Sequence, residues 1–210
     1  MRKMPVRPAR SSLDSTTRSR YVGRMRVAFK EWAVVVDALG RGEQILILRK
    51  GGLREGSDGF QIERPQFLLF PTRFHQQREA VRPAAQARFD RMAPGFPAED
   101  RVRLEYVAEI IAWQRLDSLA VAQRLCGQHI LRDEVVAERF EWGRQQNIFA
   151  IAVRVFRLPV AVDLPMLPQY GGCKSWIDLE TDVDTSAAAP VMNDQDFSSR
   201  LKNFEEALAL

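Results

Sequence analysis

The sequence predicts an α+β fold, a small mixed, partly closed β-sheet or barrel with peripheral helices. Short aliphatic runs end at glycine or proline, as buried strands commonly do. One long run alternates apolar and polar residues, which is the period of a half-buried strand. Segments with apolar residues three and four positions apart lie between these runs, without the regular strand–helix alternation of a parallel sheet.

The first elements lie between residues 27 and 52. Apolar residues from 27 to 39 follow helical spacing and end at Gly40, which predicts a helix. Residues 44–48 are aliphatic and too few for a helix, so they predict a buried strand. The strand leads into a turn at Arg49-Lys50-Gly51-Gly52.

A second strand is expected at residues 66–70, closed by Pro71, because proline cannot donate to a strand ladder. Thr72 is expected to cap a helix that runs to about residue 92 and is interrupted by Pro83. Residues 101–113 alternate and favour a long strand, although helical steps leave a helix open.

The remaining pattern predicts further elements up to the C-terminus. They are helices at 117–125 and 133–142, a strand at 147–158 ending at Pro159, a strand at 174–179 and a short helix near 195–208. We therefore expect a basic disordered arm at 1–26, a single α+β domain at 27–179 and an acidic tail at 180–210.

Charge is distributed unevenly along the chain. The net charge is +4, but residues 1–26 carry eight Arg or Lys against one acidic residue, Asp14. This arm can be a solvated tail, a phosphate-contacting arm, a targeting peptide or the product of a misassigned start. Basicity is thus expected of the arm rather than of the folded body.

Composition excludes several classes of protein. No run of about 18 apolar residues is present, so no membrane span is expected. Two cysteines are too few for a disulfide framework and indicate a reducing, cytoplasmic setting. Two histidines rule out a histidine-rich metal site, and we expect neither a metal nor a cofactor.

Three short segments carry candidate binding chemistry. In the first, Arg49 and Lys50 precede Gly51 and Gly52, and glycines let backbone N–H groups approach an anion. The spacing matches no nucleotide-binding fingerprint. A plain polar hairpin turn is the alternative.

The second segment holds Thr72, His75 and Gln76 at the start of the expected helix. A helix N-terminus offers free N–H donors and a partial positive charge. His75 can serve as a hydrogen-bonding or acid–base group near neutral pH. The alternative is a capping threonine beside a surface histidine.

The third segment runs from Tyr170 to Trp176 through Gly171, Gly172 and Cys173. Lys174 and Ser175 can bind an anion, and Tyr170 or Trp176 can stack on a base. We interpret Cys173 as a buried structural cysteine rather than a nucleophile, because few histidines are present to act as a base.

A fourth candidate pair is Lys30 with Glu31. Carboxylates clustered near a lysine are typical of metal-dependent nucleases. The other candidate carboxylates are Asp37, Glu63, Glu105 and Glu109. No Asp/Glu-x-Lys pattern lies on a clear strand, so a solvated face is the default interpretation.

The segments together resemble the family catalogued as domain of unknown function 1802. The resemblance covers about residues 28–179. The matching pieces are 30–33, 38–40, 44–52, 67–72 with His75 and Gln76, 139–140, 154–158 and 170–176. It implies that some relatives carry restriction-type nuclease domains, for which we expect no room here. The order of elements around residues 39–49 is also similar to small PUA-like RNA-binding barrels.

These observations favour a nucleic-acid- or nucleotide-binding module with an anion-receptive pocket where the three segments meet. RNA or single-stranded DNA is the expected partner, without a membrane. The alternatives are a nuclease-like or nucleotide-processing hydrolase using Glu31, His75 and Lys174, and a non-catalytic scaffold for protein partners. Whether the chain catalyses a reaction stays open.

Overall fold

The structure is a computed structural model that describes residues 7–8, 23–50, 55–56, 59–60, 65–73, 77–172 and 174–209. Its strands are β1 Arg7–Pro8, β2 Arg24–Trp32, β3 Leu46–Arg49, β4 Glu55–Gly56, β5 Gly59–Phe60, β6 Gln66–Thr72, β7 Arg101–Leu116, β8 Ile148–Pro165, β9 Trp176–Asp184 and β10 Ala189–Pro190. Its α-helices are α1 Ala33–Gly40, α2 Pro83–Met92, α3 Leu119–Gln123, α4 Asp133–Glu141 and α5 Asp194–Ala209.

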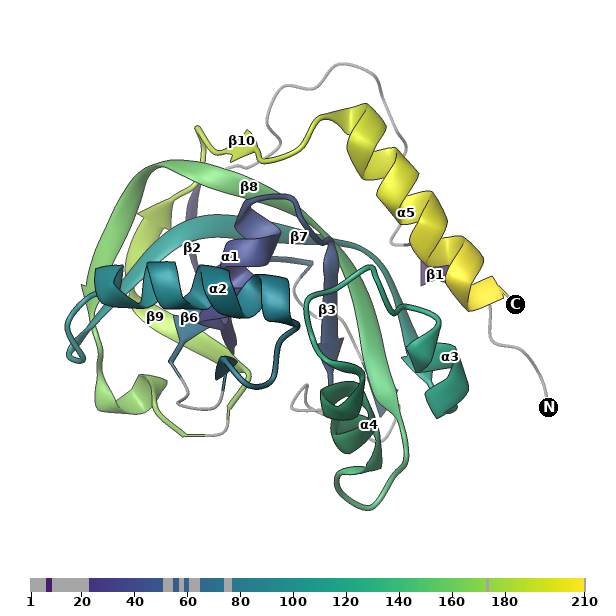
Figure 1. Cartoon of the computed structure of the whole chain (residues 1–210). Helices are drawn as coiled ribbons and strands as arrows, with labels where there is room; N and C mark the ends of the chain where they lie inside the picture. The colour runs from purple at the N-terminus through teal and green to yellow at the C-terminus, as the bar shows by residue number, and fades with distance from the viewer. Residues whose placement is uncertain are drawn as a thin grey trace.

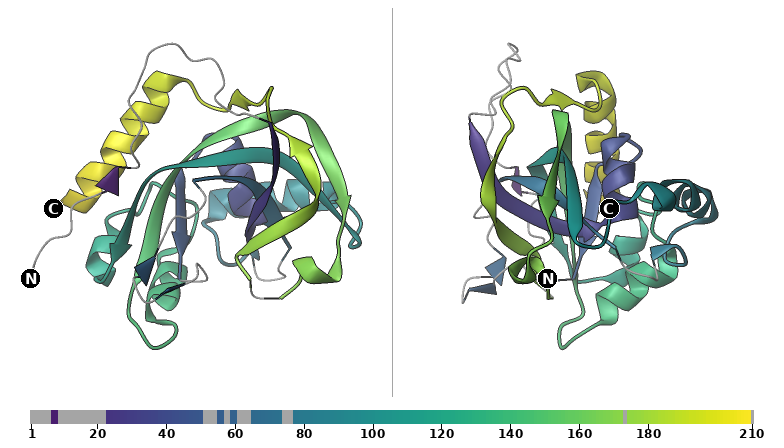
Figure 2. Two further views of the ribbon diagram at one scale, coloured as in Figure 1. Left: turned by 180° about the vertical axis from the view of Figure 1, so that it is seen from behind. Right: turned by 90° about the vertical axis from the view of Figure 1, so that its left-hand side faces the viewer.

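The described strands form one eight-stranded sheet and a separate β4–β5 pair. The main path is β10-β8-β7-β6-β2-β9, with β1 added to β7 and β3 added to β8. Only the β2–β6 pair is parallel, so the sheet is mixed. The sheet curls without closing, and helices lie around it (Figure 1; Figure 2). The predicted α+β class with a partly closed sheet is confirmed.

The two longest strands, β7 and β8, pair with each other along most of their length. The alternation that predicted a strand at 101–113 is confirmed by β7. The prediction that this strand ends at Pro159 is wrong, because β8 continues beyond it. The strand can pass through this proline because its ladder with β7 is interrupted there. Leu104 pairs with Val162 while Tyr106 pairs with Arg157, so residues 158–161 leave the regular register. Proline in such a bulge costs no ladder hydrogen bond.

The helix predicted at 27–39 is wrong in its first half. Strand β2 covers Arg24–Trp32, and α1 begins directly at Ala33. The residues from Ala28 to Glu31 are buried and lie between β6 on one side and β9 on the other. Tertiary pairing on both edges therefore decides the local structure, although apolar residues at steps of three and four run across the strand–helix junction.

The predicted helix start at Thr72 is also wrong. Strand β6 runs through Pro71 to Thr72, paired in parallel with the end of β2, and helix α2 begins only at Pro83. Strand β7 pairs with β6 only from Gln66 to Leu68. Pro71 therefore lies beyond that ladder, where its missing N–H costs no hydrogen bond to β7.

The two ends of the chain contribute to the sheet. Arg24 and Arg26, counted above with the basic arm, belong to β2, and Arg7 and Pro8 pair with β7. Strand β9 crosses residue 180, and the helix predicted near 195–208 is confirmed by α5. Phe204 of α5 is fully buried, so this helix packs against the rest of the fold.

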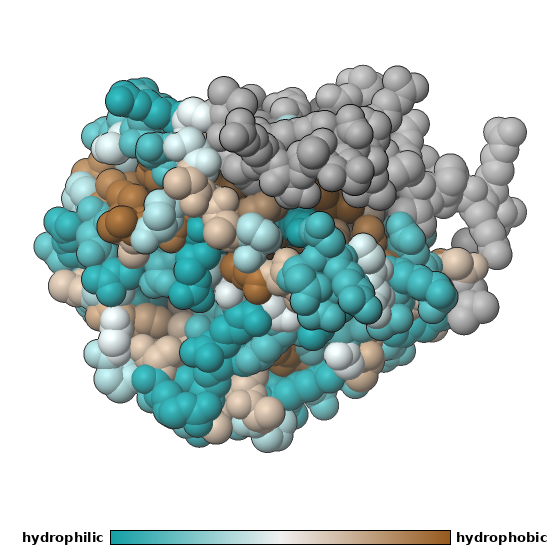
Figure 3. Space-filling model, turned by 90° about the horizontal axis from the view of Figure 1, so that it is seen from above, coloured by the Kyte–Doolittle hydropathy of each residue, from teal (hydrophilic) through white to brown (hydrophobic). Residues whose placement is uncertain are grey.

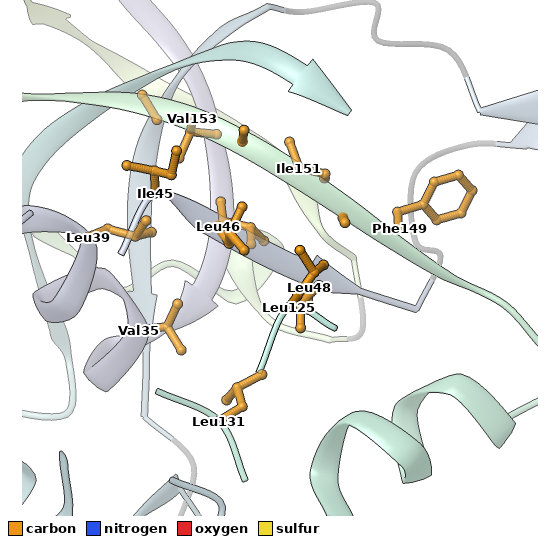
Figure 4. Close-up of a cluster of buried hydrophobic side chains, with 14 of the residues drawn as sticks. Val35, Leu39, Ile45, Leu46, Leu48, Leu125, Leu131, Phe149, Ile151 and Val153 are labelled. Carbon is orange, nitrogen blue, oxygen red and sulfur yellow. The ribbon is translucent and has the colours of Figure 1, made fainter. Parts of the chain in front are cut away.

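The largest core lies between the sheet and the helices. Val35 and Leu39 of α1 lie on the side of Leu46 of β3 in this cluster, which also includes Ile151 of β8 (Figure 4). A second, smaller core includes Leu68, Phe70 and Tyr170. Burial of these side chains from segments far apart fixes the positions of the strand ends.

One face of the molecule is shown in Figure 3. Outside the grey atoms, hydrophilic side chains surround smaller groups of hydrophobic ones. Among the helices that the structure describes, none combines the length and apolar character needed to cross a bilayer.

Candidate functional site

The three predicted segments meet at the end of β2. Strand β6 brings Thr72 to one side of β2, and β9 with the turn before it brings Ser175 to the other. The Thr72 hydroxyl donates to the Glu31 carbonyl at 3.1 Å. The Lys30 N–H donates to the Ser175 carbonyl at 2.8 Å. Segments more than 100 residues apart are thus joined around Lys30 and Glu31.

Glu31 is the buried carboxylate at the centre of this site, with only 1% of its side chain exposed. Its Oε1 accepts the Trp32 N–H at 2.7 Å. Its Oε2 is 3.7 Å from Nη1 of Arg49 and has no hydrogen-bond partner among the described residues. A buried carboxylate needs a nearby cation, and Arg49 supplies one.

Arg49 is held on several sides at the end of β3. Its Nη2 donates to Oγ of Ser175 at 2.9 Å, and its guanidinium lies 5.0 Å from the centre of the Phe29 ring. About 20% of the side chain remains exposed. The guanidinium is therefore fixed in place while part of it faces solvent, which is the arrangement that anion recognition needs.

A second guanidinium, that of Arg139 on α4, lies close to the same carboxylate. It stacks 4.2 Å from the centre of the Trp32 ring, and Nη1 donates to the Leu48 carbonyl at 2.7 Å. Burial lowers the pKa of Arg139 below its usual value, while the charge of Glu31 raises that pKa and Arg49 lowers it. The sequence analysis included Arg139 only in the family resemblance at 139–140 and not as a site residue, because it is one of several charged residues on an amphipathic helix.

Lys30 and Lys50 both bind backbone carbonyls. The buried Lys30 ammonium donates to the carbonyls of Gly171 and Gly172, at 3.1 and 3.0 Å. Gly172 has a φ of 72°, a conformation that favours glycine, and Lys30 thus shapes the turn before β9. Lys50 donates to the carbonyls of Phe140, Gln145 and Asn147, and so ties the segment after α4 to the end of β3.

The aromatic candidates differ in exposure. Trp176 is partly buried, with its ring edge-on to Phe29 and Phe67 at centroid distances of 4.8 and 5.1 Å. Tyr170 is buried in the smaller core, and its hydroxyl accepts the Glu180 N–H at 2.9 Å. Lys174 is exposed, next to the buried Ser175.

Four predicted site residues lie outside the described residues: Gly51, Gly52, His75 and Gln76. Their neighbour Gln77 is fully buried, and sequence reasoning missed it. Its side chain donates to the Thr72 carbonyl at 2.5 Å and accepts the Val34 N–H at 3.4 Å. Gln77 therefore connects the end of β6 to the first turn of α1, directly beside Glu31.

A cavity of about 670 Å³ lies elsewhere, between α1, α2 and β7. Apolar side chains such as Phe89, Met92 and Phe96 line it, together with Arg73 and Glu105. Two of the candidate carboxylates, Asp37 and Glu105, line it, whereas Lys30, Glu31 and the described site residues of the three segments do not. The cluster around Glu31 is accordingly a packed corner of the sheet with an exposed edge.

Metal binding has no support from the side chains whose positions are described. Within that part of the chain, no three His, Cys, Asp or Glu side chains gather closely enough to hold a metal ion. The chemistry available at the end of β2 is therefore that of cations and hydrogen-bond donors around one carboxylate.

Comparison with known proteins assigns the chain to a family. The family described as "Domain of unknown function (DUF1802)" matches residues 28–203, most of the chain. The chain belongs to this family. The match includes α1, the β2 strand from Ala28 onward and most of α5, so the helix near the C-terminus is part of what the family shares.

Similar solved structures include two of an ASCH protein from Zymomonas mobilis, the second a point mutant. Each is 11% identical with a TM-score of 0.42, covering 84% of this chain and 92% or 95% of the other. No curated protein is significantly similar.

Proposed function

We propose that the protein binds the phosphate backbone of a nucleic acid at the corner where β2, β3 and β9 meet. RNA or single-stranded DNA is the expected partner. Arg49 is the central contact, and the exposed Lys174 next to Ser175 is the second cation. The observation that carries this proposal is the fixed position of the Arg49 guanidinium together with its partial exposure.

The charges around the corner favour an anion. Arg49 from β3 and Arg139 from α4 approach the end of β2, where Glu31 supplies the buried carboxylate. Partly buried cations are screened less by salt than cations fully in water. Glu31 holds the Arg49 guanidinium in place and leaves the corner with a net positive charge, which attracts phosphate.

The test measures binding of a labelled 12-nucleotide RNA, and of DNA of the same sequence, by fluorescence anisotropy at several salt concentrations. Phosphate contacts make affinity fall with salt, with a slope of roughly 0.7–0.9 per contact. Replacing Arg49 by Gln, or Lys174 by Gln, is expected to weaken binding across sequences and to lower that slope by about one each.

A matched control is Lys202→Gln, which removes the charge of another exposed lysine, on α5. It should leave binding unchanged. Because Arg49 also balances buried Glu31, folding of its variant is checked by circular dichroism. The variant of the exposed Lys174 tests the phosphate contact independently of any effect on folding. The proposal is overturned if binding is unchanged in both variants but is lost when Arg2, Lys3, Arg7 and Arg10 are replaced by Gln. That result would place recognition in the basic arm.

A further inference from the structure

Trp142 is an exposed tryptophan that the proposed phosphate contacts leave unexplained. Its exposed fraction is 73%, whereas Trp32, Trp113 and Trp176 are only partly exposed. Tryptophan is among the side chains that gain most from burial. An indole kept in water beside a cationic corner is therefore a candidate contact surface for an aromatic ligand.

The segment that carries Trp142 is fixed on both flanks. Trp142 ends α4, and its N–H donates to the Glu138 carbonyl at 2.9 Å. The Lys50 ammonium binds the carbonyl of Phe140 before it and those of Gln145 and Asn147 after it. A fixed backbone reduces the conformational entropy that the segment loses on binding.

This segment also lies next to the phosphate contact proposed above. Lys50, which anchors it, directly follows Arg49 in the chain. Arg139, on the preceding helix, stacks on Trp32 beside Glu31. Arg144 is an exposed cation two residues after Trp142 in the same segment.

We infer that Trp142 is a stacking platform for an unpaired base of a single-stranded nucleic acid whose backbone runs past Arg49. The inference rests on the proposed function and narrows its substrate class. Stacking needs a free base face, which a single strand offers and the interior of a duplex does not. The protein should therefore prefer single strands to a duplex of the same sequence.

The composition of the segment favours a base over a protein partner. All six residues from Glu141 to Gln146 are exposed, and Trp142 is the one aromatic or aliphatic residue among them. Protein-binding hot spots usually lie in the middle of a surface that excludes water. A lone indole among charged and amide side chains suits a flat, polar-edged base instead.

The experiment compares Trp142→Ala and Trp142→Phe with the wild-type full chain, using a 12-nucleotide single strand and the corresponding duplex. Removing one stacked base contact is expected to weaken single-strand binding about tenfold. The Phe variant should restore most of the affinity. Duplex binding and the salt slope should not change, because stacking involves no phosphate. Val160→Ala is the matched control, an equally exposed apolar side chain on β8.

The outcomes separate this inference from the proposed function. If Lys174→Gln weakens binding while Trp142→Ala binds like the wild type, the stacking platform is wrong and the phosphate site stands. If Trp142→Ala weakens single strand and duplex equally, or Phe rescues nothing, the platform is also rejected. If the wild type binds neither oligonucleotide, both proposals fail, and a protein partner becomes the next explanation for the exposed indole.

Discussion

The two ends of strand β2 carry ion pairs with opposite characters. At its start, Arg26 Nε lies 2.7 Å from Asp182 Oδ1, and the two side chains are 54% and 33% exposed. At its end, Arg49 lies 3.7 Å from Glu31, with exposures of 20% and 1%. The shorter pair is largely in water, whereas the longer pair joins a buried carboxylate to a mostly buried guanidinium.

This difference shows that burial, rather than distance, decides how much an ion pair matters. Water and salt screen the Arg26–Asp182 attraction, so the free partner of a broken pair is simply solvated. A charge left unpaired at the Glu31 site cannot be solvated in this way, because the carboxylate is enclosed by two strands and α1. An arginine–carboxylate pair therefore contributes little to stability at the start of β2, whereas such a pair forms a fixed site at its end.

The largest effect is expected from breaking the buried end. Replacing Glu31 by Leu leaves the Arg49 guanidinium without its carboxylate and removes the negative charge that acts on Arg139. Removing one partner of a buried ion pair costs about 3–5 kcal/mol of unfolding free energy. Equilibrium urea unfolding of the variant measures this loss.

The substitution Glu31→Gln is expected to destabilise the protein less than Glu31→Leu. The amide oxygen can still accept the Trp32 N–H, although the charge is lost. Its loss of stability should lie between those of the wild type and the Leu variant. A Leu variant as stable as the wild type would show that the buried carboxylate does not organise this corner.

A buried histidine, whose charged form is disfavoured by burial, extends the comparison. His129 is 5% exposed, its Nδ1 has no hydrogen-bond partner among the described residues, and desolvation together with Arg82 lowers its pKa to about 4. The unfolded chain then binds a proton more readily than the folded protein. Stability is thus retained above about pH 6.5 and is lost as pH falls towards 4, by about 3 kcal/mol in all.

The measurement is the urea midpoint as a function of pH for the wild type and for His129→Phe. The Phe variant should lose less stability than the wild type between pH 6.5 and 4, because its ring takes up no proton. Equal pH dependence in both proteins would assign the acid destabilisation to the carboxylates alone.

The smallest effect belongs to the exposed end. The hydrogen bond from Arg26 lowers the pKa of Asp182, but both side chains keep contact with water. Asp182→Asn is expected to leave the urea midpoint unchanged within error at 0.15 M salt. A clear loss, persisting at 1 M salt, would contradict the division between the two ends of β2.

Several elements could be predicted because their pattern is local. The alternation that begins at Val102 identified β7, and the helix predicted at 133–142 corresponds to α4. The β2–α1 junction could not be predicted, because residues 27–39 satisfy a helical period across a strand and a helix. The pairing of β2 with both β6 and β9 resolved it.

The candidate site divides in the same way. The sequence indicated that Arg49, Thr72 and Ser175 were unusual, since each stands beside glycine or proline at the end of an apolar run. Arg139 and Gln77 gave no such signal. Their roles depend on what packs against them: Trp32 and the Leu48 carbonyl for Arg139, and the ends of β6 and α1 for Gln77.

The sequence by itself determined the α+β class, most strand and helix segments and the residue types at the strand ends, because these depend on period and local chain chemistry. Only the tertiary structure decided which cations share a carboxylate, which lysines are occupied by carbonyls and which tryptophan faces water. These properties depend on pairing between segments up to about 140 residues apart, such as Lys30 with Gly171, which no local pattern records.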